Sequence, residues 1–151
     1  MIVSPRLVRV LSLMILVAAG CSGDSPMAPP PSGVKATHGG DLFPLPGGRG
    51  CAEVAVEPEN ATAKGAQATK SRINLYLTNK DGSAVPSPAP TEVTFNDGLG
   101  KSLKFDADPN AGGTSAHYKS EPTSLLPGKG LTGEFAIAFG TDSIKLPVAS
   151  H

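Results

Sequence analysis

The sequence has few of the residues that build nucleic-acid-binding surfaces. Its 151 residues include no Trp and only two Tyr, and acidic and basic side chains are equal in number. A formal net charge of zero gives no electrostatic attraction for a nucleic acid, and so few aromatic rings supply no platform on which bases could stack. The composition therefore predicts a protein that does not bind nucleic acid.

Motifs of the common enzyme classes are also missing from the sequence. There is no Gly-x-Ser-x-Gly, and the glycine-rich turn Gly47–Gly50 lacks the Lys and Ser/Thr that end a phosphate-binding loop. The segment Asp106–Gly112 has the alternating oxygens of a calcium loop. However, Ala111 stands where such a loop needs Gly, and His117 stands where it needs a bidentate Glu. We therefore expect a chain that is not an enzyme.

One apolar run stands near the start of the chain. Val10–Ala19 follows Arg6 and Arg9 and is shorter than the roughly 20 residues that span a bilayer. A basic start, a short apolar run and small residues after it are typical of a secretory signal peptide. Residues 1–20 are therefore predicted to be a signal peptide that does not belong to the fold.

Small residues lead from this run directly into Cys21. The sequence Ala18-Ala19-Gly20-Cys21 resembles the lipobox of bacterial lipoproteins, with Ala18 where Leu is usual. The resemblance implies lipidation of Cys21 and a membrane anchor. Because Ser22 follows in place of Asp, it implies an outer-membrane protein that faces the periplasm of the bacterial cell envelope. An ordinary secretory signal with a fortuitous Cys21 and an uncleaved N-terminal anchor are the alternatives.

The second cysteine, Cys51, has no disulfide partner if Cys21 carries lipid. Its strand-like surroundings predict a half-buried small hydrophobic residue. Residues 21–37 are rich in Ser and Pro, and Pro29–Pro31 favour an extended polyproline conformation, so this segment is predicted to be a flexible tether. The predicted organisation is a signal peptide (1–20), a tether (21–37) and one domain (38–151).

The predicted domain consists of short segments of alternating polarity separated by turn residues. This pattern is typical of an all-β fold, and we predict a single antiparallel immunoglobulin-like β-sandwich of about 7–8 strands. Asn96-Asp97-Gly98 is a strong hairpin signal, and Pro58–Lys70 is expected to be a polar loop. The expected strands are 41–45, 51–57, 72–78, 92–95, 102–105, 115–119, 131–139 and 143–148, with an extended Pro-rich stretch at 85–90.

Several short motifs in this domain resemble a family of small bacterial envelope lipoproteins. These proteins begin their folded part with His-Gly-Gly, here His38-Gly39-Gly40. They carry a strand-turn motif, here Ile73–Gly82, and end in a short strand followed by His, here His151. Asn79 stands where an Asp is common in the family. The resemblance implies an immunoglobulin-like sandwich, and related His-Gly-Gly starts occur in periplasmic parts of heavy-metal efflux systems.

His38 is the sharpest candidate for chemistry. Imidazole and carboxylate ligands suit copper and zinc, so His38 with Glu53 or His151 forms a candidate metal site. Gly39 and Gly40 allow a ligand to approach the backbone closely. The alternative is that His-Gly-Gly is a strand-entry turn. His117 is expected to be an ordinary strand residue, with a third metal ligand as its alternative.

These features together predict a lipid-anchored envelope protein whose β-domain is a non-catalytic binding or interaction module. Its partner would be another envelope protein, bound through an edge strand or the end loops. The alternatives are a periplasmic copper- or zinc-binding module and a purely structural envelope component. We expect no other cofactor.

Overall fold

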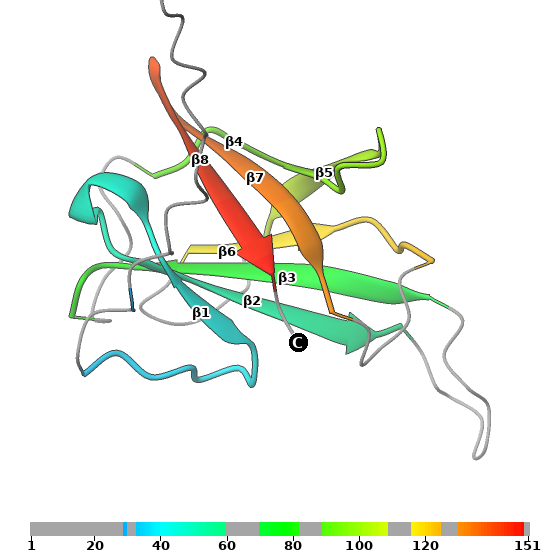
Figure 1. Ribbon diagram of the computed structural model, residues 1–151, viewed down its shortest axis with the longest axis horizontal. Helices are drawn as coiled ribbons and strands as arrows, with labels where there is room; N and C mark the ends of the chain where they lie inside the picture. Colours follow the sequence, from blue (N-terminus) through cyan, green and yellow to red (C-terminus); the bar gives the residue numbers. More distant parts are fainter. Residues whose placement is uncertain are drawn as a thin grey trace, which may run out of the picture.

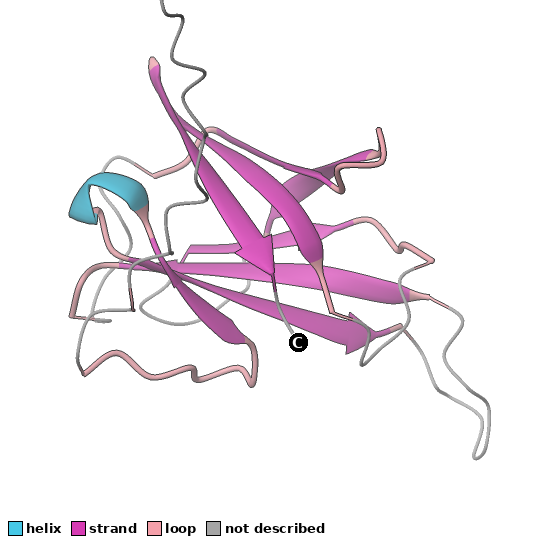
Figure 2. Ribbon diagram, in the orientation of Figure 1, coloured by secondary structure: helices cyan, strands magenta, loops and turns pink. Residues whose placement is uncertain are grey.

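The computed structural model describes residues 29, 33–59, 70–81, 89–108, 116–124 and 130–149. The predicted signal peptide, Cys21, most of the tether, residues 60–69 of the predicted loop and His151 lie outside the described residues. Within the described ranges the chain is all-β, as predicted. Its one helical element is a short turn, η1 (Pro46–Gly48), drawn in cyan in Figure 2.

Eight antiparallel strands form a single sheet. All eight were predicted from alternating polarity and turn residues. The observed ends of each strand differ from the predicted ends by no more than two residues. Thr78 and Phe139 end strands as predicted. The strands are β1 (Asp41–Pro44), β2 (Cys51–Pro58), β3 (Ser71–Thr78), β4 (Glu92–Asn96), β5 (Ser102–Ala107), β6 (Ala116–Ser120), β7 (Thr132–Phe139) and β8 (Asp142–Ala149).

The sheet curls over itself into two layers. Its strand order is β1-β2-β3-β6-β5-β4-β7-β8. Figure 1 shows β1, β2, β3 and β6 in the lower layer, with β4, β7 and β8 crossing above them. Strand β5 joins the layers because it pairs with β4 along one edge and with β6 along the other. The predicted sandwich is therefore one continuous, barrel-like sheet.

The core lies between the two layers and is built from one face of each strand. On β3, for example, Ile73, Leu75 and Leu77 point inward and are fully buried. Aromatic rings fill the centre: the Phe135 ring lies 4.9 Å from Phe95 and 5.3 Å from Phe105, measured between centroids. Such offset and edge-on ring pairs stabilise a core beyond simple burial.

Arg49 connects the two ends of the sheet, near β1 and β8. It follows η1, near β1, and its guanidinium donates a 3.0 Å hydrogen bond to Asp142 at the start of β8. The same guanidinium lies 5.3 Å from the centroid of the Phe139 ring, in a cation–π contact. Arg49 therefore links the β1–β2 turn to the β7–β8 turn.

Both edge strands of the sheet carry a proline. Strand β1 has one paired neighbour and ends in Pro44, and β8 has one paired neighbour and contains Pro147. A proline has no backbone N–H to donate, so an added strand would find the hydrogen-bonding ladder interrupted at either edge.

Phe135→Ala should lower the free energy of unfolding by about 3–5 kcal/mol, because it removes a fully buried ring that two other rings contact. Leu99→Ala is the matched control. Leu99 is 92% exposed at the β4–β5 turn, so the same kind of truncation there should change this free energy by less than about 0.5 kcal/mol. Urea denaturation of both variants measures the difference, and equal effects would show that the core is placed wrongly.

Candidate functional site

The outer face of β2, β3 and β6, opposite the core, carries a row of buried polar and aromatic residues. Glu53 pairs across the sheet with Tyr76, and Tyr76 pairs with His117. All three are less than 9% exposed, although their side chains point away from the core. Cys51, on the same face of β2, is fully buried rather than half-buried as predicted. An outer sheet face is normally solvated.

Residues 37–40, here called the strap, bind to this face through Glu53. The Glu53 carboxylate accepts hydrogen bonds from the backbone N–H groups of Thr37 (2.9 Å), His38 (2.7 Å) and Gly40 (3.0 Å). Hydrogen bonds to an ionised acceptor are roughly twice as strong as neutral ones. Thr37, assigned above to the tether, is thus in direct contact with the sheet.

The ring of His38 adds two further contacts. Its Nδ1 lies 3.0 Å from Glu53 Oε2, and the imidazole stacks on the Tyr76 ring with centroids 3.6 Å apart and planes within 4°. On its other side the Tyr76 ring stacks on His117, at 4.2 Å and 15°. Tyr76 is therefore held between two imidazoles.

Polar partners fix His117 in turn. Its Nε2 lies 2.9 Å from Asn74 Oδ1, and its Nδ1 lies 3.5 Å from Asp108 Oδ2. Burial, and then the charge of Lys119, lower the pKa of His117 below its usual value, although Asp108 acts in the opposite direction. The neutral ring is thus the favoured form at neutral pH. Within the described residues the buried Nδ2 of Asn74 has no hydrogen-bond partner.

Burial would raise the pKa of Glu53, but hydrogen bonds from Gly40, Thr37 and His38 more than compensate, so that this pKa falls below its ordinary value. Glu53 is therefore ionised at neutral pH. Its neighbour Tyr76 shows the opposite change, because burial and the charge of Glu57 raise the pKa of the phenol.

The two glycines of the strap have separate roles. Gly39 takes a left-handed conformation, with φ of 76°, which lets the strap turn into β1. Gly40 lies so close to β2 that a Cβ there would stand 2.3 Å from the carbonyl oxygen of Val54. Gly40 thus permits a close approach to its backbone. The group that approaches is the Val54 carbonyl of β2, whereas a ligand was expected there.

The candidate metal residues are brought together only in part. His38 and Glu53 are in contact, whereas His151 lies outside the described residues. His117 is separated from His38 by the Tyr76 ring, and both its nitrogens have protein partners. The described part of the chain contains no group of three His, Cys, Asp or Glu side chains arranged to hold a metal ion.

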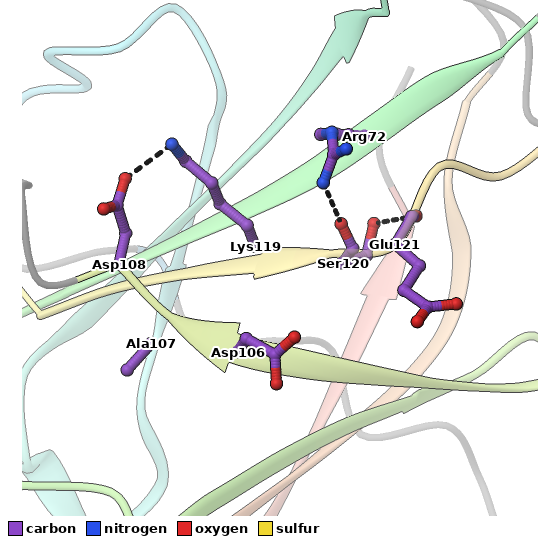
Figure 3. A pocket seen from close by; sticks show the side chains of 7 residues that line it. All are labelled: Arg72, Asp106, Ala107, Asp108, Lys119, Ser120 and Glu121. Atoms are coloured by element: carbon purple, nitrogen blue, oxygen red, sulfur yellow. Dashed lines mark hydrogen bonds and ion pairs between the residues drawn. The ribbon is translucent and has the colours of Figure 1, made fainter.

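A polar pocket of about 220 Å³ adjoins this row on the outer face. Figure 3 shows Lys119 directed toward Asp108 and Arg72 directed toward the Ser120 carbonyl oxygen. Arg72 also forms a salt bridge with Glu59 at 2.8 Å. Both cationic side chains of the pocket thus have partners within the protein. The lining residues are Arg72, Asp106, Ala107, Asp108, Lys119, Ser120 and Glu121.

Tyr76 and Asn74 were not singled out from the sequence, and His117 was expected to be an ordinary strand residue. The alternation of β3 and β6 does place Asn74, Tyr76 and His117 on the non-core faces of their strands. What alternation does not give is the register between β3 and β6, which are separated by two intervening strands in the chain.

Comparison with known proteins gives no relative: no protein-family model, no curated protein and no solved structure matches this chain. The resemblance to envelope lipoproteins that begin with His-Gly-Gly therefore stays a prediction.

Glu53→Gln should lower the free energy of unfolding at pH 7 by about 1.5–3 kcal/mol, because an ionised acceptor of several hydrogen bonds becomes neutral. The folded-state pKa of Glu53 lies below its unfolded value. Its stabilising effect is therefore complete above the unfolded pKa and is lost as the pH falls through the folded one. The difference between wild type and variant should shrink as the pH falls below about 4.

Glu57→Gln is the matched control, since Glu57 lies on the same face of β2 and is exposed. Chemical denaturation at several pH values from neutral to acidic measures the free energy of unfolding of the wild type and of both variants. The interpretation fails if Glu57→Gln destabilises as much as Glu53→Gln, or if the Glu53→Gln difference is independent of pH.

Proposed function

We propose that this chain is a lipid-anchored protein of the bacterial cell envelope, placed at the outer membrane and facing the periplasm. Its β-domain is a non-catalytic interaction module. The support for anchoring is the sequence Ala18-Ala19-Gly20-Cys21, followed by a Pro- and Ser-rich segment. The described residues include no helix long and apolar enough to cross a membrane.

The main observation in support of this proposal is the way in which the chain enters the domain. The strap follows the tether directly, and the sheet binds it with three charge-assisted hydrogen bonds and a stacked ring. Such contacts order the point at which an anchored chain would meet its domain. This arrangement suits a module that is held firmly at the end of its tether.

The fold also favours one route of partner binding over another. Pro44 and Pro147 interrupt the two sheet edges, which disfavours the addition of a partner's strand there. The β4–β5 turn is better suited to a partner. Asp97 Oδ1 accepts hydrogen bonds from the N–H groups of Leu99 and Lys101, so a structured loop holds the exposed Leu99 away from the domain. We propose that the end loops make the contacts.

Cys21→Ser should abolish incorporation of labelled fatty acid in growing bacteria and release the protein from the membrane fraction, because it removes the thiol to which the lipid attaches. Cys51→Ala is the matched control, and it should keep both the label and the membrane association. Label that survives Cys21→Ser would disprove lipidation at this residue.

A second candidate function is metal binding, and one contact favours it. The imidazole of His38 is 36% exposed and directs Nδ1 to Glu53, so its Nε2 remains as a possible metal ligand. A carboxylate that orients a histidine through its other nitrogen is the usual outer-shell arrangement of metal sites. In this reading Glu53 orients His38, and His151 supplies a further ligand.

If this function holds, calorimetric titration of Zn²⁺ or Cu²⁺ should give one ion per chain with micromolar affinity or tighter. His38→Ala and His151→Ala should each remove the binding because each deletes a ligand. His117→Gln should keep it, since Tyr76 separates this residue from His38. Wild-type protein that binds neither ion would eliminate the metal candidate.

A further inference from the structure

The strap and β1 together form an N-terminal arm, Thr37–Pro44, whose contacts lie at one end of the sheet. The strap contacts Glu53 and Tyr76 on β2 and β3, and β1 pairs with β2 alone. The groups that receive the arm therefore belong to the body of the domain. They remain in place whichever chain supplies the arm.

The receiving site has a defined ligand chemistry. Glu53 accepts a set of backbone N–H groups, and Tyr76 offers a ring face that His117 supports from behind. The position of Gly40 admits no side chain, because a Cβ there would meet the Val54 carbonyl. The ligand is thus a peptide that bends at its first glycine and in which an aromatic or imidazole ring is followed by two glycines. The sequence known to fit is the chain's own His38-Gly39-Gly40.

The arm is joined to the body by the turn Leu45–Gly50, which is the hinge of any exchange. Gly47 and Gly48 both have positive φ, and one backbone hydrogen bond, from Leu45 N–H to the Gly50 carbonyl, closes the turn. Glycines change conformation at low cost. An arm that leaves the body exposes the buried Glu53 charge and removes Phe43 from the core, so both must be covered again. Opening the turn also costs the burial of Leu45 and the contact between Arg49 and Asp142.

We propose that this site binds the arm of a second copy, so that two chains exchange residues 37–44 and each completes the Glu53–Tyr76 site of the other. Exchange repeats every contact of the arm with the body, and the turn Leu45–Gly50 acts as the hinge, which is the usual route of domain swapping. The closed form is favoured in dilute solution by its high effective concentration. Exchange therefore dominates where copies are crowded, and this part of the argument rests on the proposed membrane anchoring.

A disulfide reports directly on which chain supplies the arm. Pro44 in the arm is the register partner of Cys51 in β2. In a mixture of two full-length chains, one carries Pro44→Cys with Cys51→Ser, and the other is wild type. A disulfide between arm and body can then form only between chains. We expect such a mixed dimer after mild oxidation of membranes, with a yield that rises with protein density.

Two controls make this result specific. Pro44→Cys alone should form the disulfide within one chain, which establishes that the geometry permits the bond. Leu42→Cys with Cys51→Ser should give no mixed dimer, because Leu42 pairs with Glu53 and not with Cys51. A Pro44→Cys chain that forms only the internal disulfide, at every density, overturns the proposal.

A labelled peptide with the sequence of residues 33–44 tests the same site without substitutions near the hinge. It should bind the wild-type chain by displacing the chain's own arm from Glu53 and Tyr76. Failure of the peptide to bind, together with no mixed dimer, also overturns the proposal. Anchoring is tested separately: a chain released by Cys21→Ser should still exchange in concentrated solution, so the two proposals fail independently.

Discussion

The ionised carboxylate of Glu53 is the constraint on which the outer face of this domain depends. A charge buried on a sheet face is unfavourable unless hydrogen-bond donors surround it. Here the donors come from the backbone of the strap, and the ring of His38 completes the set. Because Glu53 must be covered, residues 37–40 bind to the sheet before the first strand begins, and a sheet face that would otherwise meet water becomes a second buried layer.

The stacked rings extend this layer across three strands. Tyr76 bridges the histidine of the strap and the histidine of β6, and Asn74 and Asp108 hold His117 from the sides. Both partners of Tyr76 are therefore planar rings oriented by hydrogen bonds. The lower layer of the domain thus packs on both faces, with an apolar core inside and a polar, aromatic cover outside.

The strands could be predicted from the sequence, and the site only in part. Alternation and turn residues locate a strand because both are local, and Thr78 and Phe139 end strands where they were expected to. The contact between His38 and Glu53 was also expected, although as a pair of metal ligands. The row from Glu53 to His117 depends on how β2, β3 and β6 align, and alignment between distant strands has no local signal. The joining of the layers through β5 is non-local for the same reason.

The prolines at the two sheet edges give the arm a protective role. With the arm in place, each free edge belongs to a strand that carries a proline. When the arm leaves, the edge that becomes free is that of β2, in which the first seven residues, Cys51 to Glu57, contain no proline. Unprotected edges of this kind seed indiscriminate assembly between chains. The strength of the Glu53 contacts therefore sets how rarely this edge is exposed, and with it the solubility of the domain at high density.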